Sequence, residues 1–203
     1  YSINPYYLAD LGNYYFKVGV SHSTAFIAPT VYQNFGSLPY LEPNFELKPE
    51  TNSSQEIDLS FGKTDRTMVI NASLFQRKEK DVFAYVTLPN WNGQFQNLDE
   101  NTAKGFELGF DYKLNEIFKF GGNFSFAENS NRQKMLRQPK QRANSYVEIL
   151  PFKGNRIALN YSFVSDKLDN YQFPPQFVNV QDYSLFGVNI NQKITERFDT
   201  YLN

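Results

Sequence analysis

The short stretch Asn90-Trp91-Asn92 has residue types that suit a ligand contact. Pro89 and Gly93 flank it and favour a turn, so we expect it at the tip of a loop. An indole ring at such a tip can stack on a ligand while the neighbouring carboxamides hydrogen-bond it. The same ring could instead anchor a protein interface or pack against its own loop. Ligand contact is therefore one of three interpretations of this tryptophan.

Basic residues gather in the polar segment 128–142. They are Arg132, Lys134, Arg137, Lys140 and Arg142. Because guanidinium and ammonium groups bind carboxylate and phosphate oxygens, this segment suits an acidic ligand or the phosphates of surface lipopolysaccharide. A merely solvated loop is the alternative. Arg137 from this segment, and Tyr171 from a loop expected at 165–181, complete the candidate ligand-binding residues.

Catalytic and metal-binding chemistry has little support in the chain. His22 is the only histidine and there is no cysteine, so a triad could form only around His22, and thiolate chemistry is excluded. The pairs Glu46 with Glu50 and Asp99 with Glu100 could suggest calcium or acid–base chemistry. Their loop positions favour solvated charge instead. We expect no enzyme, no catalytic residue, no metal ligand and no cofactor.

The candidate loops must be positioned by regular secondary structure, and its pattern is clearest in residues 105–126. Apolar side chains occupy alternate positions on both sides of a short turn at Asn115-Glu116. They are Phe106, Leu108, Phe110, Tyr112 and Leu114 before the turn, and Phe118, Phe120, Phe124 and Phe126 after it. Successive side chains of a strand point to opposite faces, so this pattern predicts an antiparallel hairpin with one apolar and one polar face.

The same hairpin pattern recurs about five times along the chain. Strands are expected near 3–8, 14–24, 55–61, 67–75, 143–150, 156–164 and 182–194, and a last strand begins near 198. Short turns alternate with long connections, of which 25–54 contains four prolines that disfavour a strand. Outer-membrane barrels sort their loops in this way, with short periplasmic turns and long extracellular loops.

Composition supports an all-β antiparallel transmembrane barrel portion of about ten strands. The 203 residues are 17% aromatic, yet mean hydropathy is negative at −0.53, as expected where half of each strand faces water. The net charge of −1 gives no reason to expect nucleic acid as a partner. A soluble β-sandwich adhesin or carbohydrate-binding module would have a similar composition, and an outer-membrane enzyme is a third, weaker alternative.

Several short motifs, in order, resemble the barrel of TonB-dependent outer-membrane receptors. They are Phe26-Ile27-Ala28-Pro29, then Asn44-Phe45-Glu46-Leu47-Lys48-Pro49-Glu50, then Glu56-Ile57, and later Asn97 followed by Lys104-Gly105-Phe106-Glu107. Within that family, 136–140 and 163–169 are most similar to the vitamin B12 (cobalamin) receptor, with siderophore receptors as the alternative.

The resemblance implies active import through the outer membrane of a Gram-negative bacterium. It implies a 22-stranded barrel closed by an N-terminal plug, with energy delivered by a TonB complex through that plug. The expected ligand is cobalamin or a ferric siderophore, and outer-membrane lipid surrounds the wall. Residues 1–203 then represent a partial barrel without the plug. No metal ligand is carried over from the family.

Overall fold

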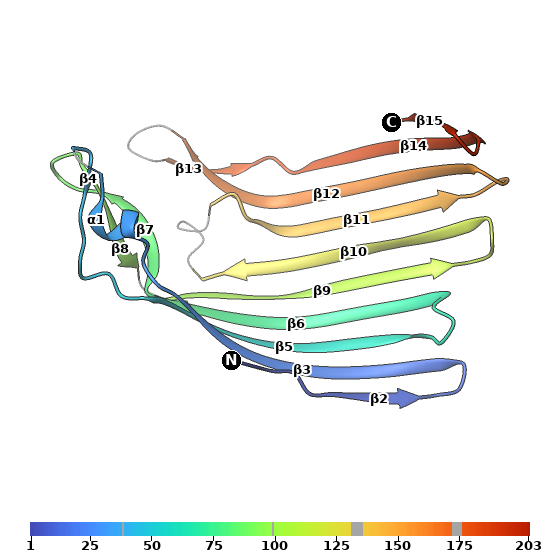
Figure 1. Ribbon diagram of the computed structural model, residues 1–203, viewed down its shortest axis with the longest axis horizontal. Helices are drawn as coiled ribbons and strands as arrows, with labels where there is room; N and C mark the ends of the chain where they lie inside the picture. The colour runs from blue at the N-terminus through green and yellow to red at the C-terminus, as the bar shows by residue number, and fades with distance from the viewer. Residues whose placement is uncertain (38, 99, 131–135, 172–175) are drawn as a thin grey trace.

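Most of the chain forms one antiparallel sheet in which neighbouring strands largely follow the order of the sequence (Figure 1). The computed structural model describes residues 1–37, 39–98, 100–130, 136–171 and 176–203, with Leu98 and Tyr171 described by their backbone alone. The strands of this sheet are β1 (Ser2–Ile3), β2 (Tyr6–Asp10), β3 (Tyr14–Ile27), β5 (Glu50–Lys63), β6 (Met68–Lys80), β9 (Asn101–Lys113), β10 (Phe118–Asn129), β11 (Pro139–Ile149), β12 (Asn155–Tyr171), β13 (Gln176–Val180), β14 (Tyr183–Thr195) and β15 (Phe198–Leu202).

Connections of different length lie at opposite ends of the strands (Figure 1). The turns 11–13, 64–67, 114–117, 150–154 and 196–197 lie at one end. The segments 28–49 and 81–100 extend from the other end and build a separate cap. This confirms the expected sorting of short turns and long connections.

The strand register places apolar side chains in rows on one face of the sheet. Three successive rows run across β3, β5, β6 and β9: Phe16–Phe61–Ile70–Phe110, Val18–Leu59–Ala72–Leu108 and Val20–Ile57–Leu74–Phe106. A shift of one residue in any pairing would turn a whole strand's apolar set to the other face, so these rows fix the register. Leu59, Ile57 and Leu74 remain 39%, 45% and 57% exposed.

The apolar face has no second layer of protein against it. Among the described residues, the buried hydrophobic ones are Leu41, Ala103 and Ala158, and no large side chain is fully buried. A sandwich would bury the apolar faces of two sheets against each other. The sandwich alternative is therefore wrong for this fold, and the exposed apolar face is that of a barrel wall.

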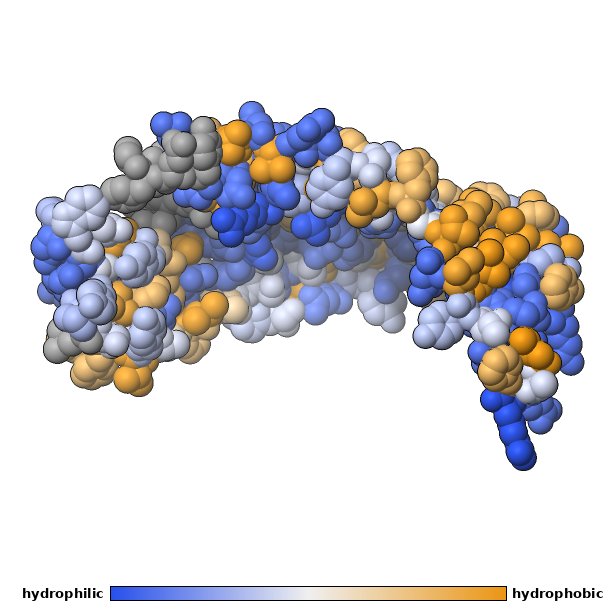
Figure 2. Space-filling model, turned by 90° about the horizontal axis from the view of Figure 1, so that it is seen from above, coloured by the Kyte–Doolittle hydropathy of each residue, from blue (hydrophilic) through white to orange (hydrophobic). Residues whose placement is uncertain are grey.

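The opposite face is polar and lines the hollow of an arched molecule (Figure 2). One row across six strands reads Ser60–Asn71–Gly109–Asn123–Asn144–Ser162. The Ser162 hydroxyl donates to Asn144 Oδ1 at 2.8 Å. Hydrophobic residues gather instead on the convex side of the arch, toward the end with the short turns (Figure 2).

The cap is a small separate unit within the two longest described connections. It consists of helix α1 (Val31–Phe35) and a three-stranded sheet of β4 (Leu41–Glu42), β8 (Gly93–Leu98) and β7 (Val82–Thr87). Thr30 is the N-cap of the helix: its hydroxyl accepts from the Gln33 backbone N–H, while the Gln33 side chain accepts from the Thr30 backbone N–H. This reciprocal capping supports a helix too short to be stable alone.

Several strands are longer than the alternation predicts. β12 continues to Tyr171 and pairs with β13, where a loop was expected from 165 onward. β11 starts at Pro139, and hairpin β7–β8 was missed altogether. Alternation of apolar and polar residues reports a face in contact with lipid or core. The added parts of β11 and β12 lie beyond the apolar rows and are polar on both faces, so the alternation disappears there. β7 (VFAYVT) lacks it for the opposite reason, because nearly all of its residues are apolar.

Candidate functional site

The Asn90-Trp91-Asn92 stretch forms the tip of hairpin β7–β8, as expected. The backbone turns tightly there. The Leu88 N–H donates to the Asn92 carbonyl at 2.8 Å, and the Trp91 N–H donates to the Leu88 carbonyl at 2.9 Å. Trp91 has a positive φ of 69° and its side chain is 74% exposed. The loop tip thus combines a strained backbone at Trp91 with a largely exposed aromatic residue.

The two carboxamides beside Trp91 hold the tip on the neighbouring strand. Asn90 Nδ2 and Asn92 Nδ2 donate to the same oxygen, Glu42 Oε1, at 2.6 and 3.0 Å. These hydrogen bonds favour the ionised carboxylate and keep the pKa of Glu42 below its ordinary value of 4.5. The sequence pattern identified the amides but not this carboxylate, which lies on a distant part of the chain.

Protonation of Glu42 is expected to loosen the hairpin tip. Since the pKa is depressed in the folded tip, the stabilisation is fully present above the ordinary pKa and is lost as pH falls through the lowered one. Hydrogen exchange of the Trp91 and Asn92 amides should therefore speed up in acid, once the pH falls below the ordinary glutamate pKa of 4.5, beyond the intrinsic change with pH. In Glu42→Gln the exchange is expected to be faster already at pH 7. Equal protection of the two proteins at pH 7 would contradict this role.

Further aromatic side chains pack against one another on the same cap. Phe35 packs edge-on against Phe45 with ring centroids 5.2 Å apart, and Phe95 contacts both Tyr85 and Tyr32 at 5.9 and 6.0 Å. Further exposed members of this aromatic cap are Tyr40 and Trp91. Gly93 lets the Tyr85 ring lie over the hairpin, because a Cβ at residue 93 would displace that ring from its place. The cap thus offers apolar, π-rich surface on a hydrogen-bonded frame.

The motif residues found in the sequence are the frame of this cap. Asn97 Oδ1 accepts from the Lys48 backbone N–H at 2.8 Å, and Asn97 Nδ2 donates to the Lys48 and Asp81 carbonyls at 2.9 and 2.6 Å. Asn44 Nδ2 donates to the Phe95 carbonyl at 2.8 Å. Beyond the short pairing of β4 with β8, residues 43–49 are therefore held to β8 by side-chain amides.

The remaining predicted binding residues are divided between described and undescribed parts of the chain. Arg137 Nε pairs with Asp169 Oδ1 at 3.0 Å, and Lys140 Nζ lies 3.2 Å from Glu128 Oε1. Arg132, Lys134 and Asp99 lie outside the described residues, as does the side chain of Tyr171. Arg137 and Lys140 are therefore engaged in ion pairs rather than forming one uncompensated basic patch.

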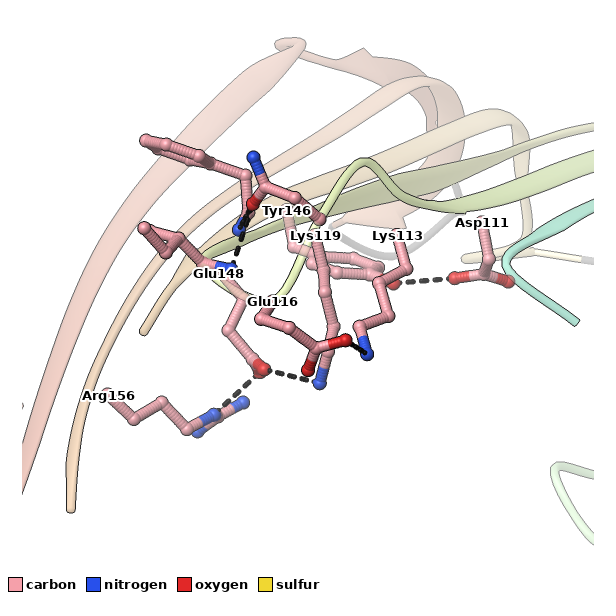
Figure 3. Close-up of polar contacts among 10 residues, drawn as sticks. Asp111, Lys113, Glu116, Lys119, Tyr146, Glu148 and Arg156 are labelled. Carbon is pink, nitrogen blue, oxygen red and sulfur yellow. Dashed lines mark hydrogen bonds and ion pairs between the residues drawn. The ribbon is translucent and has the colours of Figure 1, made fainter. Parts of the chain in front are cut away.

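Charged groups also meet in the hollow, close to the short turns (Figure 3). Glu148 binds two cations from neighbouring strands, Lys119 Nζ at 3.1 Å and Arg156 Nε at 2.6 Å (Figure 3). The Tyr146 hydroxyl donates to Asp111 Oδ1 at 2.6 Å (Figure 3). These contacts cross-link β9, β10, β11 and β12 on their polar face, a role the sequence did not indicate.

No metal or membrane-helix feature is found in the described part of the chain. No three His, Asp or Glu side chains gather closely enough there to hold a metal ion. The helix α1 is too short to cross a membrane, and none of the described helices is long and apolar enough to do so. His22 lies on β3 beside Tyr1, with its Nε2 3.3 Å from the tyrosine hydroxyl.

A curved antiparallel sheet with an apolar outward face, a polar hollow and loops sorted by length is the wall of an outer-membrane β-barrel. The chain belongs to the TonB dependent receptor-like β-barrel family, whose model matches residues 6–203. Members of that family are outer-membrane proteins of Gram-negative bacteria and act as transport receptors rather than enzymes.

Solved structures share this fold at low sequence identity. The siderophore receptor PirA from Pseudomonas aeruginosa is 21% identical with a TM-score of 0.73, covering 96% of this chain and 34% of its own. Pyoverdine-bound FpvA from Pseudomonas aeruginosa PAO1 is 15% identical with a TM-score of 0.72, covering 93% and 29%. The copper transporter OprC is 18% identical with a TM-score of 0.67, covering 94% and 31%.

The chain spans about a third of the length of these structures. No curated protein sequence matches it. The likeness establishes the fold, and one fold serves receptors for different ligands, so the ligand has to be argued from the site.

Proposed function

We propose that the chain forms wall and outer loops of a TonB-dependent importer for a ferric siderophore. The observation that carries this proposal is the aromatic cap, which is exposed yet held by a dense set of side-chain amide hydrogen bonds. Rigid aromatic surface on a loop frame is suited to stacking on the flat rings of a catecholate-type chelator. PirA and pyoverdine-bound FpvA support a siderophore in preference to cobalamin.

The ligand-binding residues have different roles in this proposal. Trp91 stacks on the bound ligand, while Asn90 and Asn92 present it by holding the hairpin tip on Glu42. Arg137 and Tyr171 contribute from the rim formed by β11 and β12. Binding, rather than bond-making chemistry, is the task of these residues. In this proposal the energy for import is delivered by a TonB complex through a plug domain.

Replacement of Trp91 by alanine in the complete receptor is expected to weaken ligand binding. Loss of one stacked ring costs about 0.5–1.5 kcal/mol beyond lost contact area, so we expect Kd to rise about tenfold. Trp91→Phe keeps an aromatic face and should recover most of the affinity. Titration of the purified receptor with ferric enterobactin and ferric pyoverdine, followed by quenching of protein fluorescence, measures both variants.

Cyanocobalamin in the same titration separates the two ligand classes. Saturable binding of cyanocobalamin, with no binding of either ferric siderophore, would overturn the siderophore proposal and favour the cobalamin receptor. Equal affinity for the siderophore in wild type and Trp91→Ala would be consistent with a siderophore importer but would show that Trp91 does not contact the ligand.

A further inference from the structure

The outward face changes from apolar to polar between two neighbouring rows that each cross five strands. The apolar row is Val20–Ile57–Leu74–Phe106–Phe126, and the polar row, two residues nearer the long loops, is His22–Gln55–Gln76–Lys104–Glu128. In a barrel wall the end of the apolar band marks the boundary between lipid chains and head groups. The two rows therefore lie at the membrane–water interface on the side of the long loops.

A groove of about 660 Å³ runs along these two rows. Ile57, Leu74 and Phe106 line its apolar part, and His22, Gln76 and Lys104 line its polar end. Ile57 and Leu74 are 45% and 57% exposed. The described residues therefore leave the apolar part of the groove open to another molecule. A groove that is hydrophobic at one end and polar at the other matches a molecule with the same division.

The polar end is rich in hydrogen-bond donors and carries positive charge. Gln55 and Gln76 bring carboxamides, Lys104 brings an ammonium group, and Lys78 follows Gln76 on the same face one row higher. Among the described residues, the Lys104 side chain has no ion pair. The nearest acid in its row, Glu128, is engaged by Lys140 at 3.2 Å. This end therefore favours an anion, and phosphate oxygens are common partners of lysine and amide donors.

We propose that this groove binds one acyl lipid with a phosphate head group. The phosphate lies against Lys104 and the carboxamides of Gln55 and Gln76, with Lys78 adding long-range attraction. One acyl chain lies along Ile57, Leu74 and Phe106. The inference rests on the barrel wall and its register, and not on which ligand the receptor imports.

The test uses the complete receptor, purified in detergent and stripped of lipid. Native mass spectrometry compares binding of phosphatidic acid with that of diacylglycerol carrying the same chains. We expect one phosphatidic acid to be retained, and at least fivefold weaker retention of diacylglycerol. Lys104→Gln should reduce phosphatidic acid binding at least fivefold, whereas Lys153→Gln, which removes a lysine from a short turn at the opposite end, should not.

Three results would overturn the proposal. Equal retention of phosphatidic acid and diacylglycerol would mean that lipids bind the apolar surface without regard to the phosphate. Equal retention of phosphatidic acid by Lys104→Gln and Lys153→Gln would mean that the groove is not the site. Full competition by equimolar inorganic phosphate would mean a free-anion site that ignores the acyl chain. Should Lys104→Gln fail to fold, Gln76→Glu, which places a negative charge in the same row, is expected to show the same loss.

Discussion

Replacement of Leu108 by arginine is expected to lower the folding stability of the barrel by about 2–4 kcal/mol, the cost of a cation near the bilayer midplane. Leu108 lies in the middle of β9, between Ala72 on β6 and Phe124 on β10, and its side chain faces outward. Leu108 is still 47% exposed among the described residues, so lipid must cover the rest, and lipid cannot solvate a guanidinium. Urea unfolding of the complete receptor in phospholipid vesicles measures the loss.

Asn123→Arg is the matched control, because it places the same group on the other face of the same hairpin. Asn123 is exposed in the polar hollow, opposite Gly109 and Asn144. There the arginine remains in water, and the expected change in unfolding free energy is below about 1 kcal/mol. Equal losses in the two variants would mean that Leu108 does not face lipid, and the assignment of the outward face would fail.

Replacement of Asn97 by alanine is expected to release the proline-rich segment from the cap and leave the barrel intact. The change removes three hydrogen bonds to the backbone of Lys48 and Asp81, each worth about 0.5–1.5 kcal/mol. Hydrogen exchange of the Lys48 amide should accelerate at least tenfold. Affinity for ferric siderophore should fall with it, because the cap aromatics lose their frame.

Two further variants separate this clamp from a general loss of packing. Asn97→Asp keeps the acceptor for the Lys48 amide but turns a carboxylate oxygen toward two carbonyls, so we expect it to be at least as damaging as alanine. Gln96→Ala lies next in the strand and loses only a bond from its Nε2 to Gln94 Oε1, so exchange at Lys48 should stay unchanged. If the Lys48 amide exchanged in Asn97→Ala at the wild-type rate, the proposal that Asn97 holds this segment would be contradicted.

The fold could be predicted from sequence wherever the two faces of a strand meet different solvents. The hairpin 105–126 was placed correctly because lipid selects apolar groups on one side and water selects polar groups on the other. Beyond the apolar rows the extension of β12 is polar on both faces, and β7 (VFAYVT) is apolar on both, so neither shows the alternation that identifies a strand. Their order is set by pairing with neighbours far along the chain.

The candidate site was only half predictable, for the same reason. Trp91 and its flanking amides could be recognised as a loop tip from local turn chemistry. Their partner Glu42, 48 residues from Asn90, could not, since nothing in either stretch specifies the other. Asn97 and the segment containing Lys48 belong to motifs that follow one another along the chain. Only the folded cap shows that they are hydrogen-bonded to each other.

The sequence by itself determined that the chain forms hairpins with one apolar and one polar face, sorts its loops by length, and lacks a catalytic constellation around its single histidine. Those properties depend on residue type and on spacing along the chain. The tertiary structure decided that the apolar face stays uncovered, that amides and a carboxylate lock the cap, and that an apolar row meets a polar, donor-rich row in one groove. These depend on strand register, which brings distant residues side by side and which no single strand specifies alone.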